Sequence, residues 1–288
     1  MAATVFKESS HSLRKFKSDL MMAITVAATI VTLIPLFLVL GYLVFKGTTS
    51  LNWAFFTHMP TPVGEKGGGM ANAIVGTLEV VGIACLIGVP VGIGAGLFLA
   101  EHRSYRIANA VRFSADVMTG VPSIVVGIFA YAVLVRPMGR FSTLAGSAAL
   151  AFIMIPLVTR TTEEMILLVP HELREAALAL GVPQWKTSLA VIVRTALSGI
   201  ATGVILSIAR IAGETAPLLF TAFGNRFWSM SLVQPIATLT VQVYTYAISP
   251  FPDWQRQAWA GALVLTAIVL ALELGVRWVT RAPAKAVR

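Results

Sequence analysis

Residues 20–45 read LMMAITVAATIVTLIPLFLVLGYLVF, a run without a single charged side chain. About 20 mostly apolar residues are enough for a helix to cross the hydrocarbon core of a membrane. The composition of the whole chain agrees with such a helix, because 57% of its 288 residues are hydrophobic and only 12% are charged. Soluble domains carry about 25% charged residues. These observations predict an integral membrane protein.

Five more long apolar runs follow the first. A spanning segment must satisfy its backbone hydrogen bonds internally, so each run is predicted to form an α-helix. The third run is the least regular, since Arg112 and Asp116 stand just before it. The sequence therefore predicts an all-α protein with six transmembrane helices, at residues 20–45, 71–100, 117–135, 144–169, 188–223 and 258–280.

Lysine and arginine are distributed unevenly between the two sides of these helices. They are frequent before the first run, after the second, between the fourth and fifth, and after the sixth, and they are sparse in the other connections. Cytoplasmic segments carry the excess of positive charge in membrane proteins, so both termini are predicted to be cytoplasmic. This bias accounts for most of the net charge of +9. No nucleic-acid partner is expected, because the basic residues do not gather on one solvated surface.

Other features narrow the class further. The first run is too long for a signal-peptide core and has no A-x-A cleavage site after it, so we expect it to remain as a membrane helix. Cys85 is the single cysteine, which excludes an internal disulfide and suits a small packing residue better than a metal ligand. The sequence also lacks a G-x-x-x-x-G-K-[ST] phosphate loop. Any energy for transport must therefore come from another subunit or from an ion gradient.

Between the fourth and fifth runs, residues 170–189 read PHELREAALALGVPQWKTSL. They predict a short helix from about His171 to Leu180 on the cytoplasmic side, which ends at Gly181 and is followed by a new helix near Gln184. The small residues Ala176 and Ala177 suit a surface that another protein approaches closely. An ordinary helix at the membrane interface explains the same composition equally well.

Glu175, Ala176 and Ala177, followed after three residues by Gly181, resemble the EAA signature of permease subunits of bacterial ABC importers, which have a MetI-like transmembrane domain. The resemblance implies a type I importer fold and a coupling helix that docks into a groove of the cytoplasmic ATPase. It extends to Val191 and Val193, but Arg194 stands where the signature has proline.

Four stretches resemble the PstA-type permeases of phosphate importers: 121–129 (VPSIVVGIF), 199–222 (GIATGVILSIARIAGETAPLLFTA), 234–239 (QPIATL) and 249–261 (SPFPDWQRQAWAG). The resemblance implies a multi-pass protein of the bacterial cytoplasmic (inner) membrane that forms half of a pathway for inorganic phosphate. It implies three partners: a second permease of the PstC type, an ATPase dimer of the PstB type and an outer phosphate-binding protein of the PstS type. The chain itself is then no enzyme and binds no cofactor, since ATP and magnesium belong to the ATPase.

The predicted organisation follows from these segments. A cytoplasmic tail (1–19) precedes an accessory membrane helix (20–45) and an external loop (46–70). The permease core of five membrane helices (71–280) contains the coupling loop (170–186), and a second cytoplasmic tail (281–288) ends the chain. The external segment 225–256 is rich in aromatic residues, which mark membrane interfaces. It is also long enough to fold back into the helix bundle or to meet the outer binding protein.

Two charged residues interrupt the fifth apolar run. A charge at the centre of a membrane helix costs roughly 2.5–3.5 kcal/mol, so such residues usually face a bundle interior or water. On one continuous helix, Gly199, Gly203, Ser207, Arg210 and Glu214 share a face. The glycines allow a neighbouring helix to come close, and the polar side chains then point into the same interface.

Arg210 and Glu214 have two interpretations. As i,i+4 neighbours they can form a purely structural ion pair. Alternatively, the forked guanidinium binds the transported anion. Glu214 then holds Arg210 between transport cycles and accepts a hydrogen bond from a protonated oxyanion. We also place Ser207 and Glu79 in this pathway, with Glu79 either pairing with Arg210 or packing against a polar neighbour.

Three alternatives to phosphate import remain at this point. A permease for sulfate, molybdate or phosphonate would keep the class and change the cargo. A proton-coupled secondary transporter would use Glu79, Arg210 and Glu214 as a proton relay, although the sequence shows none of the inverted repeats that favour this class. A membrane scaffold without transport activity would need no polar stripe within a span.

Overall fold

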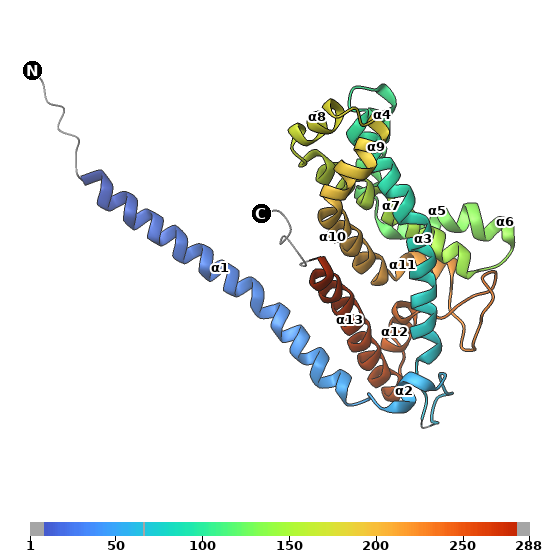
Figure 1. The fold of residues 1–288 in the computed structure, drawn as a ribbon. Helices are drawn as coiled ribbons and strands as arrows, with labels where there is room; N and C mark the ends of the chain where they lie inside the picture. Colours follow the sequence, from blue (N-terminus) through green and yellow to red (C-terminus); the bar gives the residue numbers. More distant parts are fainter. Residues whose placement is uncertain (1–8, 66, 281–288) are drawn as a thin grey trace, which may run out of the picture.

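The computed structural model describes residues 9–65 and 67–280. The regular secondary structure of this part of the chain is helical, and turns and loops join the helices (Figure 1). The helices are α1 (Ser9–Thr48), α2 (Trp53–Thr57), α3 (Ala71–Glu101), α4 (Arg106–Gly120), α5 (Ser123–Ala130), α6 (Arg136–Met138), α7 (Thr143–Leu167), α8 (His171–Ala179), α9 (Gln184–Lys186), α10 (Val193–Ala212), α11 (Ala216–Thr221), α12 (Leu239–Ala247) and α13 (Pro252–Thr280). Two π-helical stretches join α5 to α6 and α9 to α10, at Tyr131–Val135 and Thr187–Ile192.

Within the described residues, five helices are long and apolar enough to cross a membrane: Leu13–Thr48, Ala71–Glu101, Thr143–Leu167, Gln184–Ala212 and Pro252–Gly275. The chain is therefore a multi-pass membrane protein. A sixth span is obtained if the pair formed by Arg106–Gly120 and Ser123–Met138, which is bent by 107°, counts as one. The all-α prediction with six apolar segments is confirmed on that basis.

Two of the predicted spans are not continuous helices. The third, predicted at 117–135, is the bent pair, and its first half already begins at Arg106. Pro122 explains the bend, because proline disfavours the helical conformation in the residue before it, and Val121 is extended with ψ 130°. The fifth, predicted at 188–223, stops at Ala212 and resumes as α11. Each break places non-helical backbone within an apolar run.

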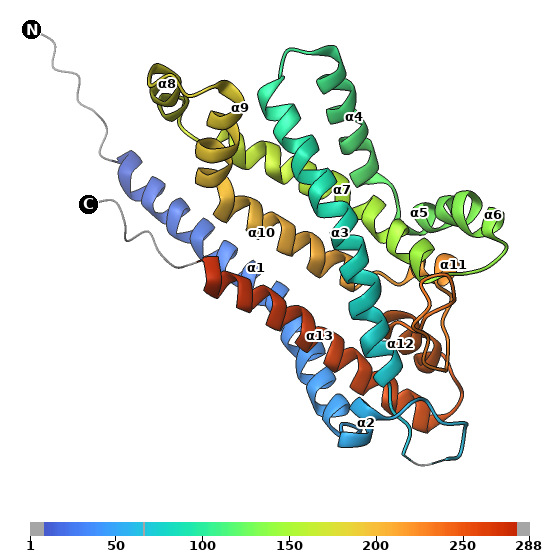
Figure 2. The same ribbon diagram turned by 45° about the vertical axis from the view of Figure 1, so that its right-hand side comes forward.

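The chain connections that carry the basic residues lie toward the same end of the molecule. Figure 2 places the start of α1, the described end of α13, the α3–α4 connection and α8 at this end, and α2 at the other. This arrangement agrees with the charge pattern, which predicts that successive connections lie on alternating sides of the membrane. That the basic end faces the cytoplasm remains a prediction.

Helices α3 and α7 form the tightest pair in the bundle, and glycines of α3 make their approach possible. A Cβ atom on Gly92 would lie 2.7 Å from Val158 Cβ, and one on Gly96 would lie 2.6 Å from the carbonyl oxygen of Thr159. The glycine-rich run 88–96 of α3 is therefore a helix-packing surface. Leu150, Met154 and Val158 of α7 lie in the core beside it.

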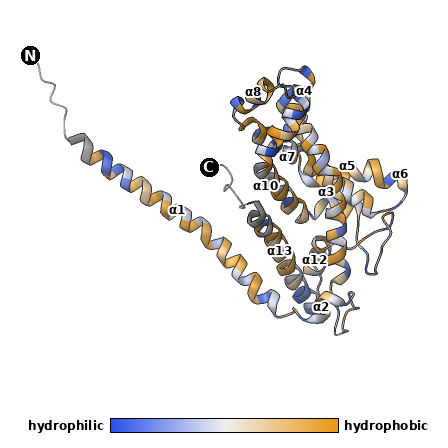
Figure 3. Ribbon diagram, in the orientation of Figure 1, coloured by the Kyte–Doolittle hydropathy of each residue, from blue (hydrophilic) through white to orange (hydrophobic). Residues whose placement is uncertain are grey.

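Helix α1 stands apart from the rest of the molecule (Figure 1). It meets α13 near its C-terminal end, where the Tyr42 and Trp259 rings pack edge to face at 5.1 Å and Gly47 lies against Leu263. From Leu13 onward, most of its apolar side chains are exposed. Figure 3 shows that the helix is hydrophobic over most of this length. The helix begins earlier than the predicted residue 20, and its position fits an accessory span outside the core.

Gly92 offers a direct test of the α3–α7 contact, with Gly94 as a matched control. A leucine at Gly92 has to displace Val158, whereas a Cβ atom on Gly94 meets nothing within 4 Å. Forcing side chains into a packed interface costs typically 1–3 kcal/mol. Gly92→Leu should therefore lower the thermal unfolding midpoint of the detergent-solubilised protein, and Gly94→Leu should leave it nearly unchanged. Equal midpoints for the two variants would contradict the packing described above.

Candidate functional site

Helix α10 carries the predicted pathway residues Ser207 and Arg210 and packs against α7 through its glycines. A Cβ atom on Gly199 would collide with the side chain of Met165, and one on Gly203 would collide with that of Thr161. The predicted close approach of a neighbouring helix is therefore confirmed. Ser207 is buried one turn further along, and its hydroxyl donates a hydrogen bond of 2.9 Å to the carbonyl oxygen of Gly203. In the described chain, this hydroxyl is satisfied within its own helix.

Arg210 and Glu214 lie on either side of a helix break, not on one continuous helix as predicted. Helix α10 ends at Ala212, and α11 begins at Ala216. Pro217 stands in the first turn of α11, where its missing N–H is tolerated, but its ring prevents α10 from continuing through it. The break therefore places Arg210 in the last turn of α10, where the negative end of the helix dipole favours a cation.

The two charged side chains form only a loose pair. Arg210 Nε lies 4.0 Å from Glu214 Oε1, which is within reach of an ion pair but too long for a hydrogen bond. The Arg210 side chain is 49% exposed and that of Glu214 is 17% exposed. The hydrogen-bond donors of the guanidinium are therefore not consumed by the carboxylate.

The bend between α4 and α5 meets the break between α10 and α11. Arg210 lines a small cavity of about 30 Å³ together with Thr119 and Ser123 from the two sides of the bend. Close by, α5 packs on α11, where a Cβ atom on Gly127 would lie 2.7 Å from Pro217 Cα. The structure thus brings two interrupted helices together at Arg210.

This meeting of broken helices was not foreseen from the sequence, although its signals were present. They are Pro122 in the third apolar run, and Gly213 with Pro217 in the fifth. Backbone that leaves the helix at membrane depth is tolerated only where protein buries it or where it lines a water-filled cavity. In transporters, such discontinuous helices commonly surround the substrate site.

Glu79 does not join Arg210. It is half-buried on α3, and no ion pair of Glu79 occurs within the described part of the chain. The buried polar contact on this stretch of α3 belongs instead to Thr77, whose hydroxyl accepts a hydrogen bond of 2.8 Å from the backbone N–H of Leu239. A role of Glu79 in the pathway stays a prediction, but its pairing with Arg210 is not found.

A charge network that the sequence did not reveal joins α4 to α7. Glu163 is buried and accepts hydrogen bonds from Arg112 Nη2 at 2.6 Å and from Arg160 Nη1 at 2.7 Å. Arg160 also pairs with Asp116, at 2.9 Å. Two cations and two anions thus neutralise each other, and the network holds α4 against α7 just before the chain bends.

The short helix predicted from about His171 to Leu180 is present as α8. It begins after Pro170 and is followed by Gly181 in the left-handed conformation with φ +77°, as expected for a glycine at a helix end. The next helix, α9, begins at Gln184 as predicted. Glu175 is exposed on α8 and its carboxylate lies 3.1 Å from His171 Nδ1.

The two alanines of the signature differ in exposure. Ala177 is buried, with 8% of its surface exposed, and its carbonyl oxygen accepts a hydrogen bond from the N–H of Val182. Ala176 is exposed. The expectation that both alanines form an open docking surface is therefore wrong for Ala177. Adjacent residues of an α-helix point about 100° apart, so one of the two can be exposed while the other faces the protein. The free surface of α8 carries Ala176 instead.

Arg174 connects α8 to the rest of the molecule. Its two terminal nitrogens donate to the two carboxylate oxygens of Glu101 at 2.6 and 2.7 Å, the paired geometry that suits arginine and carboxylate. These hydrogen bonds raise the pKa of the Arg174 guanidinium. The Ser188 hydroxyl donates to the same carboxylate at 2.9 Å. The end of α3 and the stretch after α9 therefore hold α8 in place, a cluster that sequence spacing gave no means of predicting.

A comparison with protein families agrees with this architecture. The family described as binding-protein-dependent transport system inner membrane component matches residues 92–288. The chain belongs to this family of transport proteins.

Among individual relatives, the phosphate transport system permease protein PstA of Yersinia pestis is 45% identical over 93% of this chain and 91% of its own length. The PstA protein of Haemophilus influenzae is 46% identical over 92% of this chain and 94% of its own length. The segments that resemble PstA-type permeases are thus part of a similarity that covers most of the sequence.

Solved structures show the same fold. One is the inward-facing MetNI methionine ABC transporter, with a TM-score of 0.58 at 19% identity over 74% of this chain and 96% of that one. Another is a bacterial alginate ABC transporter in complex with an alginate-bound periplasmic protein. Its TM-score is 0.66 at 15% identity, over 94% of this chain and 98% of that one. At these identities the likeness concerns the fold alone, which is that of ABC importer permeases.

The Glu163 network predicts a difference between two adjacent glutamates. Removing one partner of a buried ion pair typically costs about 3–5 kcal/mol, because the remaining charges are left uncompensated. Glu163→Ala should therefore lower the unfolding midpoint of the purified protein and its abundance in the membrane. Glu164→Ala removes the same charge from an exposed position and should change neither. A Glu163→Ala protein as stable as Glu164→Ala would show that the network contributes no stability.

Proposed function

We propose that this chain is a permease subunit of an ATP-driven importer of inorganic phosphate and forms half of the translocation pathway. The observation that supports this most strongly is its similarity to phosphate transport system permease proteins along most of its length. The proposed location is the bacterial cytoplasmic (inner) membrane, with both termini in the cytoplasm. Membership of a binding-protein-dependent family favours ATP-driven import over a proton-coupled secondary transporter.

The proposed partners follow from the same similarity. They are a second permease of the PstC type, an ATPase dimer of the PstB type and an outer phosphate-binding protein of the PstS type. Because the sequence lacks a phosphate loop, the ATPase would bind ATP with magnesium and hydrolyse it. The chain would contact its partners and lipid, carry out no chemistry and bind no cofactor of its own.

Arg210 is the proposed phosphate-binding residue of this subunit. An arginine remains charged at any physiological pH, and its planar fork matches the oxygens of a phosphate. The guanidinium is half-exposed where the two helix breaks meet, and Glu214 leaves its donors free. An anion that approaches Arg210 therefore finds hydrogen-bond donors without first having to break a tight salt bridge.

Glu214 is proposed to limit how strongly the anion is held. At 4.0 Å it neutralises Arg210 loosely when no anion is present, and it repels a fully ionised anion. A protonated phosphate can donate a hydrogen bond to this carboxylate, whereas fully ionised sulfate cannot. This contact would favour phosphate over sulfate or molybdate, the main alternative cargoes along with phosphonate.

The surface of α8 is proposed to dock onto the ATPase. Glu175 and Ala176 are exposed on it, Gly181 ends the helix, and the Arg174–Glu101 contact connects it to α3. A force on α8 would therefore act on α3 and, through the α3–α7 pair, on the helices around Arg210. Ala177 would support the shape of α8 from inside instead of contacting the ATPase.

Substitutions at Arg210 and Glu214 separate the two interpretations of the pair. If the pair is only structural, Arg210→Gln with Glu214→Gln should restore whatever either single change impairs. If Arg210 binds the anion, the double variant should be abundant in the membrane but take up phosphate at least tenfold more slowly, since a lost hydrogen bond to a charged group is worth about 1.5–3 kcal/mol. Arg210→Lys should also be slow, because an ammonium group lacks the fork.

The measurement is uptake of radiolabelled phosphate by cells that contain the other subunits, with membrane abundance checked by immunoblotting. Arg140→Gln, at an exposed position in the loop before α7, is the control for loss of positive charge. Glu214→Gln should weaken the discrimination between the two anions, so that sulfate inhibits phosphate uptake more strongly than it does in the unchanged protein. Full phosphate uptake by the double variant would remove this pair from the pathway.

A bulky charge at Ala176 tests the docking surface of α8. Ala176→Arg should leave the protein inserted and stable, because the position is exposed, but should weaken co-purification with the ATPase and reduce uptake. Ser104→Arg, on the exposed connection between α3 and α4 toward the same end of the molecule, should affect neither. Normal ATPase binding by the Ala176→Arg protein would mean that the ATPase docks elsewhere.

A further inference from the structure

A second cavity, lined by apolar as well as polar residues, lies between the loop after α11 and helix α12, toward the end of the molecule opposite to α8 (Figure 2). Its volume is about 310 Å³, space for about ten waters at roughly 30 Å³ each. Arg226, Gln242, Thr238, Thr245 and Tyr246 supply polar groups to its wall, and the residues that line it include no carboxylate. The cavity thus combines one fixed positive charge with neutral hydrogen-bonding groups.

Arg226 is exposed on the loop, and an aromatic contact positions its charge without neutralising it. Within the described part of the chain, no acidic side chain lies within ion-pair distance of Arg226. Its guanidinium carbon lies 5.3 Å from the centre of the Trp254 ring, a cation–π contact that leaves the N–H donors at the edge of the guanidinium free. Trp254 is itself stacked on Tyr246 at 4.6 Å.

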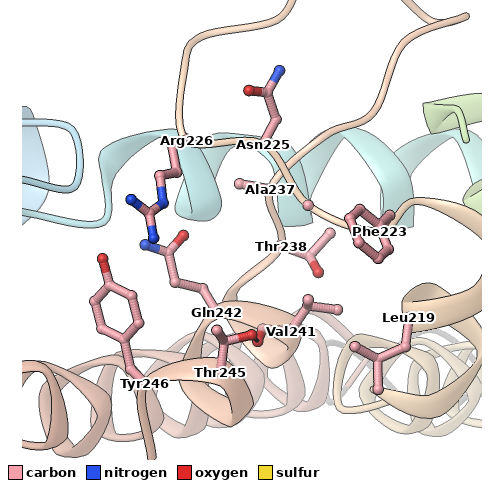
Figure 4. Close-up of a pocket in the computed structure, with 11 residues that line it drawn as sticks. Leu219, Phe223, Asn225, Arg226, Ala237, Thr238, Val241, Gln242, Thr245 and Tyr246 are labelled. Carbon is pink, nitrogen blue, oxygen red and sulfur yellow. Dashed lines mark hydrogen bonds between the residues drawn. The ribbon is translucent and has the colours of Figure 1, made fainter. Parts of the chain in front are cut away.

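The side chains in the cavity converge. Figure 4 places the Arg226 guanidinium beside the amide of Gln242, with the Tyr246 hydroxyl turned toward the same space. Asn225 points away from them (Figure 4). Its amide donates to the carbonyl oxygen of Pro235 at 3.3 Å and thereby ties the two ends of the loop together. The donors thus come from a loop and a helix that are fixed relative to each other.

The backbone at the edge of this cavity is in an unusual conformation. Phe223 has φ +64°, in the left-handed region that a bulky residue rarely adopts, and Gly224 follows with φ +115°. Stacking of Phe223 on Phe141 at 4.7 Å and the hydrogen bond from its N–H to the carbonyl oxygen of Leu218 hold this turn. Such strain persists where the surrounding structure fixes it, and it clusters at functional sites.

We propose that this cavity is a second, weak binding site for a small tetrahedral oxyanion, with Arg226 as its cation. Identifying the anion as phosphate rests on the proposed function. The cavity shares α11 with the first site, since Leu219 lines it and Glu214 stands just before α11. A single cation without a helix dipole or a second arginine binds an anion loosely, which suits a site that an anion must enter and leave quickly.

Thiol labelling tests the cavity independently of transport. Thr245 is an exposed residue of the wall, so Thr245→Cys in a Cys85→Ala background creates a single thiol in this chain. The importer in lipid nanodiscs is treated with an anionic ethylsulfonate or a cationic trimethylammonium methanethiosulfonate, and labelling of this chain is followed by mass. Relative to a small free thiol, Thr245→Cys should prefer the anionic reagent by about tenfold, because a fixed charge concentrates counter-ions.

Three further arms identify the cause of this preference. Arg226→Gln should remove it, whereas Arg140→Gln should not. Inorganic phosphate should slow the anionic reaction when chloride at equal ionic strength does not, which separates occupancy from general screening. If another oxyanion protects the thiol and phosphate does not, the cavity is confirmed as an anion site while phosphate as the cargo is contradicted.

Several results would overturn the proposal. They are equal rates with the two reagents, failure of both reagents to reach the thiol, absence of protection by any oxyanion, and a preference that persists in Arg226→Gln. The proposal would also be contradicted if Arg226→Gln abolished phosphate uptake while the ratio of anionic to cationic labelling stayed that of Thr245→Cys alone. That result would mean that Arg226 pairs with a carboxylate of a docked protein.

Discussion

The structure depends on one constraint of the membrane, which is that a backbone N–H or carbonyl released from a helix must find another polar partner or water. Two breaks raise this problem in the described chain, between α4 and α5 and between α10 and α11. They lie against each other, with Gly127 of α5 in close contact with Pro217 of α11. A polar region thereby forms inside an apolar bundle, and Arg210 stands at its edge.

The charged residues of the chain have different tasks according to how tightly they are paired. Glu163 is buried, and its two partly exposed arginines approach it at distances typical of strong hydrogen bonds, so the three hold α4 against α7. The contact between Arg174 and Glu101 similarly holds α8 on α3. Arg210 is only loosely paired and Arg226 rests on an aromatic ring, so these two retain free donors. The geometry thus distinguishes structural charges from those available to a transported anion.

Local patterns in the sequence predicted much of the fold. The apolar runs predicted the spans, the glycines of α10 predicted close packing, and Gly181 predicted the end of α8. The breaks were missed because hydropathy averages over Pro122 and Gly213, and periodicity was extended across them. The pairing of Arg112 with Glu163 joins residues 51 positions apart, a distance at which no local pattern operates. The inward direction of Ala177 depends likewise on how α8 sits on its neighbours.

The central claim is that the meeting point of the two broken helices is where the transported anion passes Arg210. Electron cryomicroscopy of the assembled importer, arrested by an ATPase variant that binds but does not hydrolyse ATP and supplied with inorganic phosphate, tests it most directly. The account predicts both breaks in place and tetrahedral density within hydrogen-bonding distance of the Arg210 guanidinium. A straight helix through Gly213, or Arg210 fully engaged by a carboxylate with the anion density elsewhere, would contradict it.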